Sequence, residues 1–223
     1  MRRPRQSARS RLRCAAFLSN VMFTISDCHP PRCRVSCPVI LASASPRRRE
    51  LMGRITEDFA VVVSDVEEVR DPAWSVQELP RYLAAQKAEA VSKSRPDALV
   101  IGADTIVALD GTVLGKPRDD EDAFLMLKNL SGKTHKVLTG VAFYRGGKEL
   151  SSFVQTTEVD FYPLSDRQIR RYLVTGEHRD KAGAYGIQGF GGLFVEGIRG
   201  DYFNVVGFPL AKVAKELEKW EDR

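Results

Sequence analysis

The stretch Leu99-Val100-Ile101-Gly102-Ala103-Asp104-Thr105-Ile106-Val107 decides how this chain folds. Residues 99–101 form a short apolar, β-branched run, which is typical of a buried strand. Gly102 ends this run, and we expect Asp104 to follow just beyond the strand. The ends of strands are where α/β sheets usually carry their sites.

A second apolar run follows and predicts a turn at Asp110-Gly111. The loop after it contains Gly115-Lys116-Pro117. A carboxylate on a rigid strand and a lysine on a nearby loop suit a charged, phosphorylated substrate. An aspartate after a strand can also be a turn former or a helix cap, so this stretch alone leaves both interpretations open.

Charge is distributed unevenly along the 223 residues. Residues 1–37 contain eight arginines and a single acid, Asp27, so they carry +7, whereas the whole chain carries +5. The remaining residues therefore carry −2, and we do not expect the body to bind nucleic acid. The body is long enough for one sizeable α/β domain or two small lobes.

All four cysteines lie in the same N-terminal segment, so the body depends on neither disulfides nor thiolate-bound zinc. The apolar run between residues 14 and 25 is too short to span a bilayer. The composition resembles a secretory signal or an organellar transit peptide, and a later translation start, for instance at Met22, is a third interpretation. We expect residues 1–37 to be a disordered leader or a gene-model artefact.

Residues 38–223 are expected to form the folded domain, and the protein to be cytoplasmic, or organellar if the leader is genuine. The predicted strands cover residues 38–42, 59–63, 99–101, 137–144, 153–161 and 193–198. The predicted helices follow Ser45, Ser75, Asp119 or Asp120, and Ser165, and a last one covers residues 209–220. The glycine-rich residues 180–192 predict a shaped loop that approaches a ligand closely.

The turn after the first strand predicts an anion site. Ser45 is a good N-cap and Pro46 a good first helical residue, so a helix begins directly after the strand. Free backbone N–H groups, hydroxyl donors and the guanidinium groups of Arg47 and Arg48 then converge. A capped surface helix with solvated arginines is the alternative.

Several motifs in order resemble the Maf nucleotide pyrophosphatases. They are Leu41-Ala42-Ser43-Ala44-Ser45-Pro46-Arg47-Arg48, Gly102-Ala103-Asp104-Thr105, Gly115-Lys116-Pro117, Leu130-Ser131-Gly132, Asp180-Lys181-Ala182-Gly183, Tyr185-Gly186-Ile187-Gln188-Gly189 and the segment 200–209. The resemblance covers roughly residues 38–220. It implies an α/β fold like that of the inosine triphosphate pyrophosphatases, with a mixed elongated sheet flanked by helices and two lobes around a central cleft.

The resemblance also implies an activity, namely hydrolysis of a nucleoside triphosphate to the monophosphate and pyrophosphate with a divalent metal, Mg or Mn. Asp104 corresponds to the family's proton acceptor. Arg47, Thr105 and Gln188 correspond to positions that set substrate choice. In this role such an enzyme would prevent the incorporation of unwanted or modified nucleotides.

Side-chain chemistry adds further candidates. The candidates for binding phosphate are Ser45, Arg48, Lys87, Lys116 and Lys181. The candidates for holding the metal are Asp104, Glu67 and Glu68, since Mg²⁺ takes one or two carboxylates and keeps several waters. The histidines His29, His135 and His178 are flanked by ordinary surface residues, and we expect no covalent intermediate.

Gln188 is the residue that we expect to recognise the base. A carboxamide offers an acceptor and two donors, so it can pair with both N3–H and O4 of uracil or thymine. The loop around Gln188 resembles the branch of the family that acts on dTTP and UTP, although a flipped amide leaves CTP open. A nucleotide-binding regulator of septum formation without turnover is the alternative function. The expected partner is a nucleoside triphosphate, with no nucleic acid and no membrane, and a homodimer stays open.

Overall fold

The computed structural model describes Cys33 and residues 35–221, which contain one mixed sheet. The strands are β1 (Val39–Ala42), β2 (Phe59–Val61), β3 (Leu99–Leu109), β4 (Thr112–Leu114), β5 (Thr134–Arg145), β6 (Lys148–Phe161) and β7 (Val195–Arg199). Their order is β2-β1-β3-β5-β6-β7, and β4 pairs with β3. The pairs β1–β2 and β1–β3 are parallel and the others are antiparallel, so the predicted mixed α/β class is confirmed.

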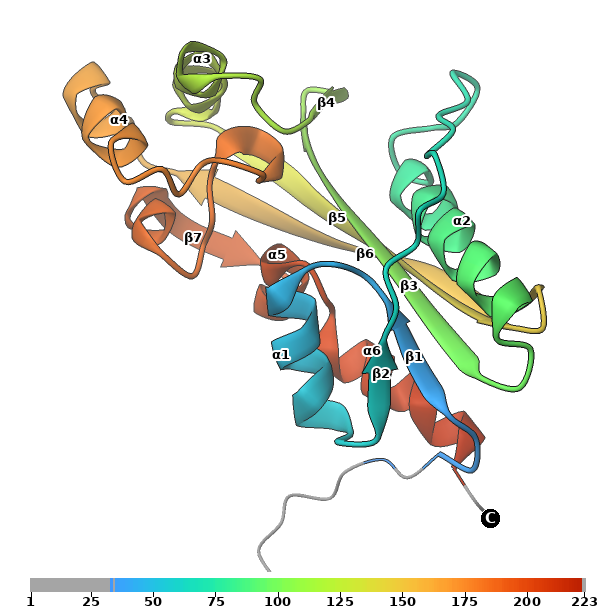
Figure 1. Cartoon of the computed structure of the whole chain (residues 1–223). Helices are drawn as coiled ribbons and strands as arrows, with labels where there is room; N and C mark the ends of the chain where they lie inside the picture. The colour runs from blue at the N-terminus through green and yellow to red at the C-terminus, as the bar shows by residue number, and fades with distance from the viewer. Residues whose placement is uncertain (1–32, 34, 222–223) are drawn as a thin grey trace, which may run out of the picture. The chain divides into compact units, whose positions relative to one another are not determined.

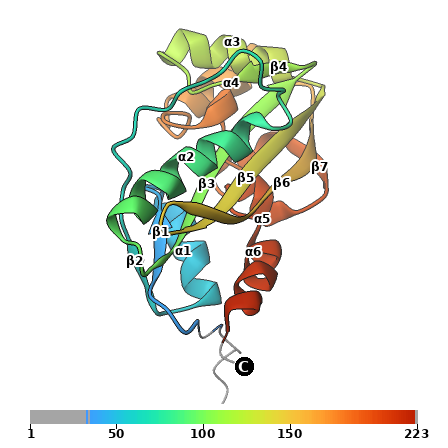
Figure 2. The ribbon, with the colours of Figure 1, turned by 90° about the vertical axis from the view of Figure 1, so that its right-hand side faces the viewer.

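Helices cover both faces of this sheet (Figure 1). They are α1 (Pro46–Ile55), α2 (Leu79–Ser94), α3 (Asp120–Leu130), α4 (Asp166–Leu173), α5 (Tyr202–Val206) and α6 (Leu210–Leu217), with the short 3₁₀ helices η2 (Ala182–Ala184), η3 (Phe190–Phe194) and η4 (Glu218–Trp220). Figure 2 shows α2 on one face and α1 and α6 on the other. No helix in the described part of the chain is long and apolar enough to cross a membrane.

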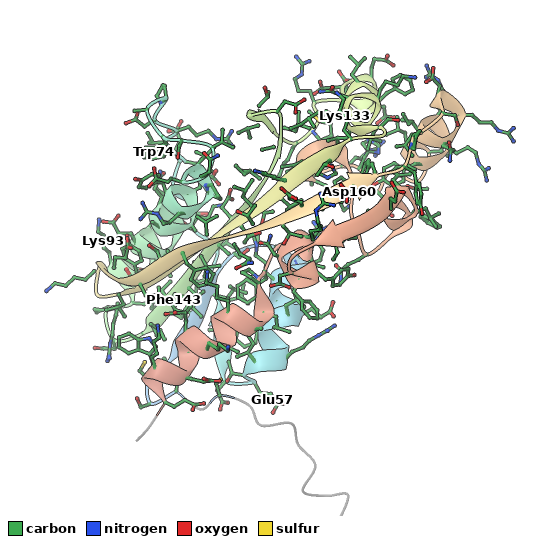
Figure 3. All side chains as sticks on the ribbon, turned by 180° about the vertical axis from the view of Figure 1, so that it is seen from behind. Glu57, Trp74, Lys93, Lys133, Phe143 and Asp160 are labelled. Carbon is green, nitrogen blue, oxygen red and sulfur yellow. The ribbon has the colours of Figure 1, made fainter. Side chains whose placement is uncertain are left out.

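The hydrophobic core is divided along the long strands. One cluster joins α3 and α4 to one end of β3 and β5, and includes Val107 and Val137. A second cluster joins α1 and α6 to the other end of β3 and β5. It includes Ile101 and Phe143, of which Phe143 is labelled in Figure 3. These positions share one face of the sheet because side chains alternate along a strand. Two smaller clusters complete the core, one beneath α2 and one around Ile106 and Leu138.

Local sequence signals account for most helix ends. The side chains of Ser45, Asp119 and Ser165 accept hydrogen bonds from backbone N–H groups in the first turns of α1, α3 and α4, as predicted. Ser75 does not cap α2, which begins at Leu79. Pro80 explains the later start, because its fixed φ suits the first turn of a helix and residues 75–78 form a turn before it.

The prediction that the central strand ends at Gly102 is wrong, since β3 continues without interruption to Leu109. Gly102 serves close packing instead: a Cβ atom there would lie 2.2 Å from the carbonyl oxygen of Ala84 on α2. Gly140 on β5 makes a similar approach, with a Cβ position 2.2 Å from the carbonyl of Pro80. Helix α2 therefore lies directly on the sheet, and Asp104 stands in the middle of a strand.

Part of the segment assigned to the leader belongs to the unit that contains the sheet, which begins at Cys33. The backbone N–H of Cys33 donates to the carbonyl of Ile55 at 3.0 Å, and Val35 pairs with Glu221. The side chains of Cys33, Val35 and Cys37 pack against the core beneath α1 and α6. The expectation for residues 1–32 lies outside the described residues.

Candidate functional site

A cavity of about 790 Å³ lies where the β1–α1 turn, the middle of β3 and two loops meet. The predicted site residues that line it are Ser45, Arg47, Arg48, Glu68, Lys87, Asp104, Thr105, Lys116 and Lys181. Residues far apart in the chain thus converge on one space. Glu67 and Gln188 are exposed and do not line this cavity.

Asp104 and Lys87 form the polar centre of the cavity. Asp104 projects from β3, and Lys87 projects from α2. Gly102 and Gly140 allow this helix to lie close to the sheet, because neither has a Cβ atom. The Nζ atom of Lys87 lies 2.5 Å from Oδ1 of Asp104 and 2.9 Å from Oε1 of Glu68. One ammonium group therefore joins two carboxylates, and both ends of the Lys87–Asp104 pair are less than one-fifth exposed.

Arg48 occupies a different position from the one expected of a phosphate-binding residue. Its guanidinium group donates to the carbonyl oxygens of Gly207 at 2.9 Å and Ala103 at 2.8 Å, and to the hydroxyls of Ser43 and Thr105. Burial lowers the pKa of Arg48 below its usual value. Most of its donors are satisfied by the protein, so Arg48 braces the wall of the cavity that it lines, and its role as a phosphate ligand stays a prediction.

Thr105 belongs to the same brace. Its Oγ1 atom accepts from Arg48 and lies 2.9 Å from the hydroxyl of Thr139 on β5. Thr139 in turn donates to the carbonyl of Asn204 at 3.1 Å, which ties the sheet to α5. The Thr105 hydroxyl is thus engaged within the protein while the residue still faces the cavity.

Three other predicted cations, Arg47, Lys116 and Lys181, also line the cavity. Arg47 follows the helix cap directly, and Lys116 stands on the loop after β4, 4.0 Å from Asp180. Lys181 donates to the carbonyl of Glu177, and its pKa is lowered first by burial and then by Arg47. The cavity therefore holds positive charge from three separate segments, which suits a polyanion.

The glycine-rich loop is shaped by Glu177, a residue that the sequence analysis missed. Its carboxylate accepts from the backbone N–H groups of Phe190 at 2.7 Å and Gly191 at 3.2 Å. A Cβ atom at Gly189 would lie 2.2 Å from the same carboxylate, so a larger residue there would displace the Glu177 side chain. Gln188 is carried by this loop, exposed at its surface. No local motif identifies Glu177, because its partners follow it along the chain at a distance.

His135 and His178 are each only 1% exposed, although their neighbours in the sequence are typical of a surface. Nε2 of His135 lies 2.8 Å from the hydroxyl of Tyr185, which lines the cavity. Burial lowers the pKa of His135 to about 4, so this imidazole is neutral near pH 7. Nε2 of His178 lies 2.9 Å from Asp120. Neither histidine pairs with a nucleophile.

The carboxylates that could hold a divalent metal are few. Asp104 and Glu68 both contact the ammonium group of Lys87. Their oxygens are therefore close enough together to bind one cation. No cluster of three or more histidine, cysteine or acidic side chains suited to a metal occurs among the described residues. Two carboxylates still fit Mg²⁺, which is commonly bound by one or two carboxylates together with substrate phosphates.

Comparison with known proteins gives consistent matches. The model of the family described as "Maf-like protein" matches residues 38–220. Proteins named "dTTP/UTP pyrophosphatase" from Thermococcus onnurineus and Halalkalibacterium halodurans are 54% and 48% identical, each over 81% of this chain and over 96% and 95% of their own length. A protein of the same name from Carboxydothermus hydrogenoformans is 49% identical over 82% of this chain and 98% of its own.

Solved structures are more distant. A HAM1 protein from Coxiella burnetii is 13% identical, with a TM-score of 0.48 over 82% of this chain and 99% of its own. The Staphylococcus aureus Ham1 protein is 19% identical, with a TM-score of 0.41 over 56% of this chain and 71% of its own.

Proposed function

Because this chain belongs to the Maf-like protein family, we propose that it hydrolyses dTTP and UTP to the monophosphate and pyrophosphate. The observation that carries the proposal is the position of Asp104. Asp104 lines a cavity that is also lined by arginine and lysine residues. The names of relatives that match over nearly their whole length support the same activity.

In this mechanism the triphosphate binds among Arg47, Lys116 and Lys181, which neutralise its charge. Asp104 accepts the proton of a water molecule as the water oxygen attacks the α-phosphorus. Oδ1 of Asp104 is held by Lys87, whereas Oδ2 makes no hydrogen bond to another residue of the described chain. The bond from the α-phosphorus to the bridging oxygen then breaks, and pyrophosphate leaves with that oxygen.

A divalent cation would be held by Asp104 and Glu68, and when bound it would neutralise phosphate charge. Lys87 holds these two carboxylates together in the present arrangement. Ser45 and the first turn of α1 offer backbone N–H groups and a hydroxyl to a phosphate oxygen. Mg and Mn are both consistent with oxygen ligands of this kind.

Gln188 remains the residue that we propose to hydrogen-bond to the N3–H and O4 groups of the pyrimidine base. It follows Tyr185, which lines the cavity, by a short stretch of the glycine-rich loop. Since Gln188 is exposed, pairing with the base requires the loop to turn its amide toward the bound nucleotide. Gln188→Glu would replace the amide donor by a carboxylate and is expected to weaken UTP and dTTP selectively.

The test is a comparison of specificity constants for dTTP, UTP, CTP and 7-methyl-GTP. Released pyrophosphate is converted to phosphate by an added pyrophosphatase and measured with malachite green, with Mg²⁺, with Mn²⁺ and with a chelator. We expect the two uracil and thymine nucleotides to give the highest kcat/KM. Absence of pyrophosphate from all four would favour a regulator that binds nucleotide without turnover, which needs no carboxylate among its phosphate-binding cations.

A further inference from the structure

Gln86 attaches the connection between β2 and α2 to the helix. Its Nε2 atom donates to the carbonyl oxygen of Val69 at 2.8 Å, and its Oε1 atom accepts from the Val69 N–H at 2.9 Å. One amide side chain thus satisfies both backbone groups of one residue, as a neighbouring strand would. Farther along the connection, Trp74 stacks on Tyr82 of α2 with ring centroids 4.4 Å apart (Trp74 is labelled in Figure 3).

The residues on either side of Val69 face the cavity. Glu68 and Arg70 line it, whereas Glu67 and Val69 do not. This alternation is the one that an extended chain imposes on successive side chains. Fixing the backbone of Val69 therefore directs both neighbouring side chains to the same side, where Glu68 meets Lys87 at 2.9 Å.

Arg70 carries an unpaired charge into this space. No ion pair or hydrogen bond joins its guanidinium group to another residue in the described part of the chain. Arg47 shares this property, whereas the remaining cations have partners: Lys116 lies near Asp180, Lys181 donates to a carbonyl, and Arg48 donates to the carbonyl of Gly207. A free guanidinium fork at the edge of an anion-binding cavity matches the geometry of a phosphate group.

We propose that Arg70 binds a phosphate group of the substrate, and that Gln86 is a positioning residue that holds Arg70 and Glu68 at the cavity. The proposal rests on the function proposed above, because it assigns a contact to the same polyphosphate. Gln86 acts only through the backbone of Val69 and touches no substrate itself.

The experiment measures the dissociation constant of inorganic tripolyphosphate by titration calorimetry. The variants are Arg70→Gln, Arg70→Lys and Gln86→Leu, and the matched controls are Arg171→Gln, an exposed arginine on α4, and Gln77→Ala, an exposed glutamine of the same connection. We expect Arg70→Gln to weaken binding about tenfold, the usual effect of losing one charged hydrogen bond. Arg70→Lys should recover part of this, since it keeps the charge but not the fork.

Gln86→Leu keeps the size of the side chain but makes neither bond to Val69, and it should weaken binding by a similar factor. In the double variant that combines Gln86→Leu with Arg70→Gln, the two fold-losses of tripolyphosphate affinity should not multiply, because both substitutions remove the same contact. Unchanged binding in Arg70→Gln would refute the phosphate contact, and multiplied factors would refute the route through Gln86. Unfolding midpoints are compared throughout, and Gln86→Asn, too short to reach Val69, replaces the leucine variant if that one does not fold.

Tripolyphosphate binding does not require turnover, so the two proposals fail in different ways. A wild-type protein that releases no pyrophosphate from any nucleotide would overturn the proposed function. Wild-type turnover with tripolyphosphate affinities equal in all variants would overturn the present inference alone.

Discussion

Replacing Gly102 by alanine should damage both stability and activity, because α2 rests on the sheet at this point. The new Cβ atom would lie 2.2 Å from the carbonyl oxygen of Ala84 and 3.0 Å from the Cβ atom of Ala88. Backbone cannot give way as a flexible side chain can, so α2 must retreat by about 1 Å to reach an ordinary contact distance. Overpacking of this kind costs about 1–3 kcal/mol of unfolding free energy.

The same shift should reach the catalytic centre. Lys87 is carried by α2 and lies 2.5 Å from Asp104 on β3, so a retreat of the helix by about 1 Å stretches this contact to about 3.5 Å, the outer limit of a hydrogen bond. A misplacement of about 1 Å can lower the rate about 100-fold. Urea unfolding and kcat/KM for UTP are the two measurements.

Gly53→Ala is the matched control, since a Cβ atom there meets nothing within 4 Å and the residue lies inside α1. It should stabilise the protein by about 0.5–1 kcal/mol, as alanine is the better helix former. A Gly102→Ala protein with wild-type stability and turnover would refute the argument that close packing of α2 sets the site.

Three further outcomes are expected. Asp104→Asn should lower turnover about 10²–10⁴-fold while nucleotide binding persists, measured by pyrophosphate release and calorimetry; full turnover would remove the base from the mechanism. Arg48→Met should lower the free energy of unfolding, measured in urea, by about 3 kcal/mol or more, because the carbonyls of Gly207 and Ala103 lose their charged donor. A loss below about 1 kcal/mol would contradict the structural role of Arg48. His135 has a pKa of about 4 when folded and 6.5 when unfolded, so its contribution to stability is present above pH 6.5 and is lost as the pH falls toward 4. Urea midpoints between pH 7.5 and 5 should therefore fall less steeply in His135→Gln than in the wild type, and equal slopes would refute the assignment.

Much of the fold could be predicted because local signals were strong. Ser45, Asp119 and Ser165 capped their helices as predicted, and the hairpin of β5 and β6 turns at Gly146-Gly147. Tyr202–Val206 was missed as a helix, since five residues carry too little periodicity to be recognised. The missed features depend on contacts between distant segments.

Gly102 illustrates the limit. A glycine within an apolar run can end a strand or admit a close neighbour, and only the position of α2 distinguishes the two. Arg48 is a second example: its sequence context indicates an anion ligand, yet the carbonyl of Gly207, far along the chain, accepts its hydrogen bond. His135 is buried because Phe161 and Tyr185, which come from other segments, pack against its ring.

The unbroken course of β3 has a mechanical consequence. Three neighbouring strands, β3, β5 and β6, run past both the cluster around α3 and α4 and the cluster around α1 and α6. Continuous, paired strands therefore connect these two clusters at the level of Asp104. We expect any adjustment to a bound nucleotide to occur in the connections that line the cavity, within residues 62–78 and 180–192. The Asp104 carboxylate stays fixed on β3 while these connections adapt. Hydrogen exchange of backbone amides should therefore be slowest in β3 beside Asp104 and fastest in the connections that line the cavity.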